Sequence, residues 1–81
     1  MDNERLIAPK YKRLAAFLLE ESALEGSPLL KLTHEKIASH MGTAREVVTR
    51  MLRYFQSEGM VKLTRGAIHI TDENRLEKLA E

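Results

Sequence analysis

The sequence contains no cysteine, and this absence excludes both a disulfide framework and a metal site built on thiolates. It also has no apolar run near the roughly 20 residues that a membrane-spanning helix needs. The segment from Met1 to Arg5 has neither the basic start nor the apolar stretch of a signal peptide. We therefore expect a cytoplasmic protein with no membrane partner.

The chain has 81 residues, enough for one small domain with a single core. Hydrophobic residues make up 43% of it and recur at regular spacing, which argues against disorder. The formal net charge is only +1, but residues 31–70 hold seven Lys/Arg against three Asp/Glu, and both flanking segments are acidic. Such a distribution is expected if one face meets phosphates, and chance also produces it in short chains.

The segment 43–58 has the most informative pattern. At about 100° per residue, a helix here would gather four apolar side chains in an arc of roughly 100°: Val48, Met51, Leu52 and Phe55. The other side, an arc of roughly 140°, carries Arg45, Glu46, Thr49, Arg50 and Arg53. Arginine can donate paired hydrogen bonds to guanine and glutamate can accept from cytosine, so the polar arc favours a helix in the major groove of DNA. The alternative is a face that is only solvated, which is common on surface helices.

A second helix is predicted directly before this one. Thr33 is a good N-cap for a short helix from His34 to Met41, and Gly42 is typical of the left-handed residue that follows a helix. Thr43 and Glu46 match the capping-box pattern, which predicts that Thr43 caps the long helix. Two helices joined by a turn of three or four residues with a glycine indicate a helix-turn-helix. The alternative is an ordinary helical hairpin, which needs no arginine face.

Helices are also predicted near both ends of the chain. Pro9 suits a first helical turn, so we predict a helix from Pro9 to about Ala23. Thr71 and Asp72 are expected to cap a last amphipathic helix. The apolar run 29–32 is either a short strand or an extended connector.

Two strand-like runs, residues 60–63 and 67–70, follow the long helix directly. The turn between them contains glycine, which predicts a β-hairpin. The fold class is therefore mainly α with a small β-hairpin, a winged helix-turn-helix, and its domain covers residues 9–81. The tip of the wing is placed to contact the DNA backbone through Lys62, Thr64 and Arg65. The alternative for the tip is a polar turn without a ligand.

These residues together resemble the C-terminal DNA-binding domain of the Crp/Fnr transcription regulators of bacteria. The resemblance extends over roughly residues 9–80 and rests on the segments 32–38, 41–50, 52–55, 58–61 and 66–70. Its most specific part is the Arg-Glu-x-x-x-Arg block at positions 45–50. It implies sequence-specific binding of double-stranded DNA for transcription regulation, with the helix of residues 43–58 as the recognition helix.

The resemblance also implies roles for individual residues. In the cyclic-AMP receptor branch of the family, the residues matching Arg45, Glu46 and Arg50 read base edges, and the Fnr branch departs at the position of Arg45. Arg45 and Arg50 would donate to guanines, and Glu46 would accept from a cytosine. The remaining expected contacts are with the DNA backbone, partly through the starts of helices, and involve Thr33, His34, Thr43, Val47, Thr49, Arg53, Lys62, Thr64 and Arg65.

Partners and cofactors follow from the same resemblance. Family members usually carry an N-terminal effector domain and a long dimerisation helix, and residues 1–8 are expected to be the stub of that helix. The effector domain is absent from this chain, so no cofactor is expected in it. The implied partners are double-stranded DNA with a palindromic operator, a second copy in the full-length protein, and RNA polymerase.

Two other classes of function compete with DNA binding. A winged helix can act as a protein-interaction adaptor, in which case the arginine face would bind an acidic partner. An enzyme is disfavoured because Ser39 and Ser57 have no evident base, and the three histidines show no metal-ligand spacing. We therefore predict no catalytic residues and no metal site.

Overall fold

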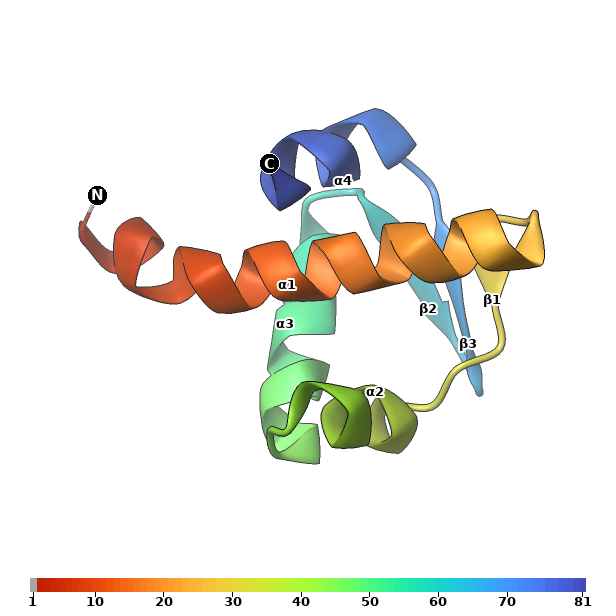
Figure 1. Cartoon of the computed structure of the whole chain (residues 1–81), viewed down its shortest axis with the longest axis horizontal. Coiled ribbons are helices and arrows are strands. Elements are labelled where there is room, and N and C mark those ends of the chain that lie inside the picture. Colours follow the sequence, from red (N-terminus) through yellow and green to blue (C-terminus); the bar gives the residue numbers. More distant parts are fainter. Residues whose placement is uncertain (1) are drawn as a thin grey trace.

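The computed structural model describes residues 2–81, with their side chains from residue 9 onward. In this range, four helices and three strands follow in the order α1, β1, α2, α3, β2, β3 and α4 (Figure 1). The helices are α1 (Asp2–Glu25), α2 (His34–Met41), α3 (Arg45–Ser57) and α4 (Glu73–Ala80). The strands are β1 (Leu29–Leu30), β2 (Val61–Thr64) and β3 (Ala67–Ile70).

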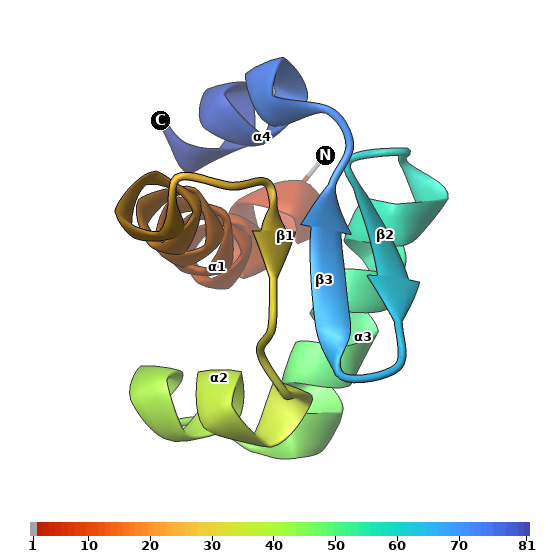
Figure 2. The same ribbon diagram turned by 90° about the vertical axis from the view of Figure 1, so that its right-hand side faces the viewer.

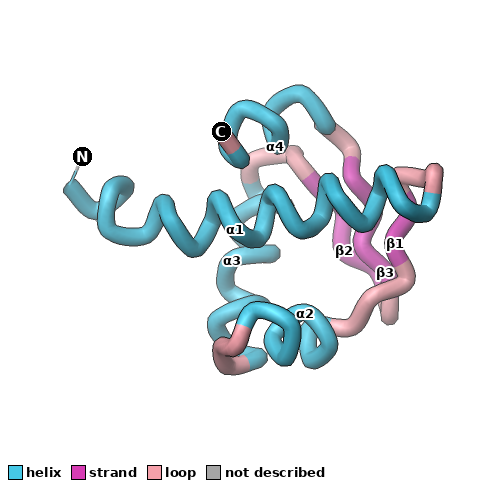
Figure 3. Tube along the Cα trace, viewed as in Figure 1, coloured by secondary structure: helices cyan, strands magenta, loops and turns pink. Residues whose placement is uncertain are grey.

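The longest helix, α1, lies between α4 on one side and α2 on the other (Figures 1 and 2). α3 crosses behind α1, and the strands gather at one end of the domain (Figure 3). α2 and α3 form the predicted helix-turn-helix, and the sheet follows as the wing, so the predicted fold class is confirmed. Within residues 2–81, no helix combines the length and the apolar character needed to cross a membrane.

One apolar core joins the helices and the sheet. The apolar arc of α3 lies inside it, as predicted: Val48, Leu52 and Phe55 are fully buried, and Met51 is nearly so. The rest of the core comes from the other elements and consists of Leu14, Ala15, Leu18, Leu30, Ile37, Ala38, Met41, Met60, Val61, Ile68, Ile70 and Leu76. Because burial contributes about 25 cal/mol for each Å² of apolar surface, this cluster provides the main driving force for folding.

The start predicted for the first helix is wrong, because Pro9 lies inside α1. Proline fixes φ near −65°, which is a helical value, so a helix can pass through it with the loss of one N–H donor. α1 ends at Glu25, slightly later than predicted, where Gly26 takes a left-handed φ of 67°. Residues 1–8 are expected to be the stub of a longer dimerisation helix. The side chains of these residues, and all of Met1, lie outside the described part of the chain. This expectation therefore stays a prediction.

Two predicted helix caps are confirmed. The Thr33 hydroxyl oxygen accepts the Lys36 N–H at 3.1 Å and begins α2. The Asp72 carboxylate accepts the Arg75 N–H at 3.2 Å and begins α4. Each cap gives a partner to an N–H that the helix leaves unpaired, which is typically worth about 1 kcal/mol. The Arg75 guanidinium also pairs with the Glu58 carboxylate at 3.0 Å, which ties α4 to the residue after α3.

The capping box predicted at the start of α3 is wrong. Gly42 ends α2 in the left-handed conformation with a φ of 70°, and the Thr43 N–H donates to the Ala38 carbonyl at 3.0 Å. Thr43 therefore closes α2 instead of capping α3. Ala44 holds the cap position without a side-chain hydrogen bond, so Glu46 has no capping hydroxyl to pair with. The turn itself, from Gly42 to Ala44, has the predicted length.

The wing is a three-stranded antiparallel sheet with the order β1-β3-β2. β2 and β3 form the predicted hairpin, in which Thr64 pairs with Ala67 across the turn. Gly66 in this turn takes a φ of 70°, a conformation that glycine adopts without strain. β1 pairs with the other edge of β3, with Leu30 opposite Ile68. The segment left open by the sequence is therefore a strand, and it makes β3 the central one.

A matched pair of leucines tests the placement of the core. Leu52→Ala is expected to lower the free energy of unfolding by about 2–5 kcal/mol, because Leu52 of α3 is fully buried. Leu24→Ala changes a side chain of α1 that is 77% exposed, and should alter it by less than about 0.5 kcal/mol. Urea denaturation followed by circular dichroism compares both variants with the parent. Similar effects of the two substitutions would contradict the burial of this face of α3.

Candidate nucleic-acid interface

The polar arc of α3 faces outward, as its sequence predicts. Arg45, Glu46, Arg50 and Arg53 are all exposed, on the side opposite the buried arc. Among the side chains that the structure describes, none forms a salt bridge or a side-chain hydrogen bond with Arg45, Glu46 or Arg50. The charged groups of this face are therefore available to a ligand.

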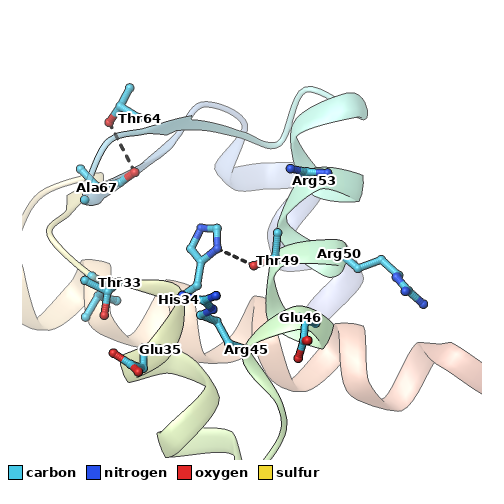
Figure 4. A pocket seen from close by; sticks show the side chains of 12 residues that line it. Thr33, His34, Glu35, Arg45, Glu46, Thr49, Arg50, Arg53, Thr64 and Ala67 are labelled. Carbon is cyan, nitrogen blue, oxygen red and sulfur yellow. Dashed lines mark hydrogen bonds between the residues drawn. The ribbon is translucent and has the colours of Figure 1, made fainter.

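A groove of about 680 Å³ lies between α3, the start of α2 and the wing (Figure 4). Many of its lining residues are ones predicted to contact DNA, namely Thr33, His34, Arg45, Glu46, Thr49, Arg50, Arg53 and Thr64. The fold thus brings to one side residues from three elements that are separate in the sequence. In Figure 4, the Arg50 side chain extends away from the other labelled side chains.

Four residues predicted to contact the DNA backbone do not line the groove. Lys62 and Arg65 are exposed, on β2 and at the turn of the wing. Thr43 lies in the turn between α2 and α3, where its N–H already serves to close α2. Val47 packs partly against the core and has no polar side-chain group. The contacts of all four with DNA stay predictions.

Sequence reasoning missed four of the groove residues. Gly66 and Ala67 complete the turn beside Thr64, so the prediction of the wing tip could have included them. Leu32 comes just before the cap of α2 and has no chemical signal of its own. Glu35 adds a second carboxylate, besides that of Glu46, to a groove with three arginines, and no pattern in the sequence indicates that it lies there. A carboxylate repels an anion, so the attraction for phosphate in the groove comes from the guanidinium groups of α3.

A side-chain hydrogen bond joins the two helices within the groove. The His34 Nδ1 and the Thr49 Oγ1 lie 2.8 Å apart, with His34 at the start of α2 and Thr49 in the middle of α3 (Figure 4). Both residues are half-buried. The bond holds the imidazole ring in one orientation and leaves its Nε2 for a further partner. The sequence predicts each residue separately as a DNA contact, but it does not predict their pairing.

The environment of His34 disfavours its charged form. Burial lowers the pKa of His34 below the usual 6.5, and the guanidinium groups of Arg45 and Arg53 lower it further. Burial removes water from the ring, and the two arginines repel an additional positive charge. The ring is therefore neutral at pH 7. The same arginines attract an anion into the groove, and a bound anion would favour the charged ring.

The groove is suited to binding by charge and hydrogen bonds. Within the described residues, no three histidine, aspartate or glutamate side chains are placed together as a metal site requires. The groups that the groove presents are guanidinium, hydroxyl and imidazole, together with two carboxylates. Guanidinium and hydroxyl groups are the usual partners of DNA phosphates, and arginine and glutamate also reach base edges.

The sequence of the domain matches a known family. Residues 12–79 match the model of the Crp-like helix-turn-helix domain, and this range includes α2, α3 and the wing. A solved structure of a Crp/Fnr-family transcriptional regulator from Eubacterium rectale covers 86% of this chain, with a TM-score of 0.85 and 63% sequence identity. The match therefore holds for both the sequence and the fold.

Two relatives come from Thermus thermophilus. The transcriptional regulator SdrP is 38% identical over 85 residues, which is 96% of this chain. The cyclic AMP receptor protein is 34% identical over 68 residues, which is 84% of this chain. This chain spans only 42% and 32% of the lengths of those two proteins, and 32% of the E. rectale chain. The chain belongs to the family of Crp-like helix-turn-helix domains, the winged-helix domains of Crp/Fnr transcription regulators.

Proposed function

We propose that this domain binds double-stranded DNA sequence-specifically for transcription regulation, with α3 as the recognition helix in the major groove. The observation that carries the proposal is the exposed face of Arg45, Glu46 and Arg50, beside a groove rich in guanidinium and hydroxyl groups. Membership in the family supports it, because the relatives are named as transcription regulators. The major groove of B-DNA is about 12 Å wide and admits an α-helix.

Sequence choice would come from the first half of α3. Arg45 and Arg50 donate to guanine edges, and Glu46 accepts from the amino group of a cytosine. Glu46 and Arg50 are four residues apart, so they project from neighbouring turns of the same side of the helix. They can therefore read nearby base pairs. Each paired contact contributes about 1–3 kcal/mol of discrimination against the wrong base.

Phosphate contacts would come from both walls of the groove and from the wing. The Thr33 hydroxyl oxygen accepts the Lys36 N–H, so its O–H remains available to donate to a phosphate oxygen. Arg53 extends the positive charge of α3 toward the wing, where Lys62 and Arg65 add two more cations. These contacts supply affinity without sequence choice, and they weaken as salt concentration rises.

In the full-length protein we expect two copies of this domain on one palindromic operator. The relatives are more than twice as long as the part that matches this chain, which leaves room for a dimerisation segment. Two copies would read half-sites about 34 Å apart on one face of the duplex. A single domain binds more weakly, because the second set of contacts is missing. RNA polymerase is the further partner that regulation of transcription implies.

Arg50→Ala is expected to abolish the preference for a cognate duplex over a scrambled one. Because a paired arginine–guanine contact contributes about 1–3 kcal/mol, the Kd for the cognate duplex should rise about 5- to 150-fold. The Kd for the scrambled duplex should stay the same. A binding selection from random duplexes supplies the cognate sequence, and fluorescence anisotropy at fixed salt measures both affinities. Lys78→Ala removes an exposed cation of α4 outside the groove and is the control.

One outcome of this experiment would change the assignment, and one further variant tests the alternative function. Equal weakening on both duplexes would make Arg50 a phosphate contact. Glu46→Ala separates base reading from a protein adaptor, since loss of the acid would relax DNA discrimination but strengthen binding to an acidic protein.

Lys62→Ala is expected to weaken binding to cognate and scrambled duplexes alike. Removal of one phosphate contact lowers the slope of log K against log salt by about 0.9. Anisotropy titrations at several salt concentrations measure this slope. Lys78→Ala on α4 removes the same charge away from the groove and should leave the slope unchanged. An unchanged slope in Lys62→Ala would remove Lys62 from the interface.

His34 should make stability and DNA affinity respond to pH in opposite directions. Its pKa in the free domain is below the 6.5 of the unfolded chain, so the fold loses stability as pH falls below about 6.5 and the unfolded chain takes up the proton. A bound phosphate favours the charged ring and raises its pKa. DNA affinity is therefore expected to rise as pH falls through the same window, by at most about tenfold per pH unit.

Titrations at several pH values measure this linkage. His34→Gln should remove the pH dependence of both quantities. His40→Gln, at the other end of α2 and outside the groove, should retain it. A parent domain whose DNA affinity does not change with pH would show that no phosphate reaches His34.

A further inference from the structure

Two side-chain hydrogen bonds, about two turns apart along α3, attach this helix to α2 and to β2. Thr49 bonds to His34 at the start of α2, and Gln56 accepts the Leu63 N–H of β2. Thr49 and Gln56 are seven residues apart, about two helical turns, so both project from nearly the same side. Thr49 lines the groove, and Gln56 lies nearer the end of α3, outside its lining. The first bond fixes α3 against α2, and the second fixes it against the wing.

The Leu63 N–H is an edge group of the sheet. β2 is an outer strand in the order β1-β3-β2, so its second edge has no strand partner within the described residues. Thr64 and Ala67 form the pair that closes the turn, and Leu63 opposite Ile68 is the next pair. Pairs alternate along an antiparallel ladder, so the N–H of the second pair points away from β3. The Gln56 Oε1 accepts it at 2.7 Å.

This bond lies at the last anchored point of the wing. Val61 is buried and Leu63 packs partly against the core, but the next three residues, 64–66, are exposed. Gln56 is itself exposed, so it contributes little to the core. The main effect of its hydrogen bond is therefore to fix the position of the wing tip relative to α3.

We propose that Gln56 is a positioning residue that sets the distance between the wing and the recognition helix, and thereby allows both to contact one duplex. The part of this proposal that concerns contact with one duplex rests on the proposed function. Without this bond, β2 is free to move away from α3 at Leu63. Lys62 and Arg65, before and after Leu63, then no longer occupy a fixed place relative to α3. The bond needs an acceptor oxygen at the end of a side chain of this length.

Hydrogen exchange at the Leu63 amide tests the bond directly. Gln56→Met keeps the length of the side chain and removes the acceptor, and the Leu63 amide should then exchange about 5- to 10-fold faster. Gln56→Glu keeps an acceptor oxygen and should restore slow exchange. NMR measures the rates in the intact 81-residue chain, with the buried Phe55 amide of α3 as the internal reference. An unchanged Leu63 rate in Gln56→Met overturns the proposal.

A double-mutant cycle tests the consequence for DNA. For each phosphate that the wing no longer reaches, Gln56→Met should weaken binding to a scrambled duplex about threefold and lower the salt slope by about 0.9. In the background of Lys62→Ala with Arg65→Ala, Gln56→Met should have no further effect. The thermal midpoint should fall by only a few degrees where Gln56→Met removes its one hydrogen bond. It should stay the same in the variant without wing cations, because those side chains are exposed.

The two experiments separate the possible failures. A further loss of affinity in the background without wing cations would mean that Gln56 contacts DNA itself, which overturns the positioning role. Faster Leu63 exchange without any change in DNA affinity overturns the second half of the proposal. No effect of the double wing variant on the salt slope refutes the wing contacts of the proposed function, while the exchange rates still decide whether Gln56 holds the wing.

Discussion

The structure depends on the burial of one stripe of α3. Val48, Met51, Leu52 and Phe55 pack into the core, and this packing sets the rotation of the helix about its own axis. Once that rotation is set, the opposite side can only face water. The outward orientation of Arg45, Glu46 and Arg50 is thus a consequence of apolar packing, and the charged residues need no interactions of their own to hold them there.

The groove adds to this face a set of groups that no single element could supply. α2 contributes a capped start, α3 contributes guanidinium groups, and the wing contributes a hydroxyl and a turn. His34 lies where these meet. Its pKa is lowered first by burial and then by the positive charges of Arg45 and Arg53. A phosphate bound in the groove would neutralise those two charges. Electrostatics and geometry therefore point to the same type of ligand.

The sequence predicts those features that depend on residues close together in the chain. It does not predict those in which one group could form a hydrogen bond with either of two elements. The stripe of α3 and the caps at Thr33 and Asp72 follow from local spacing and are predicted. Thr43 matches the pattern of a cap as well, but the left-handed Gly42 commits its N–H to α2, and no pattern shows which helix receives it. Pro9 indicates a helix start because a proline has no N–H to donate inside a helix. Its φ is nevertheless compatible with a helix, and the sequence does not show that the helix continues through it.

The site itself divides in the same way. The residues of the arginine face can be named from helical spacing, because spacing alone determines which side chains share a face. The bonds of His34 with Thr49 and of Leu63 with Gln56 join separate elements, so only the packed fold brings them together. β1, a strand of two residues, could not be distinguished from a connector because its pairing depends on where β3 lies.

The separation of the two sides of α3 also bears on how such a domain can acquire a new target. Glu46 and Arg50 have no side-chain partner among the described residues, so replacing them alters the exposed face of α3 with almost no effect on folding. Under the proposed function, descendants of this chain would acquire a new target by single exchanges at these two positions. Arg45 is different, because it also acts on the ionisation of His34. A change there would raise the pKa of His34 and, under the proposed function, would also alter the preferred base.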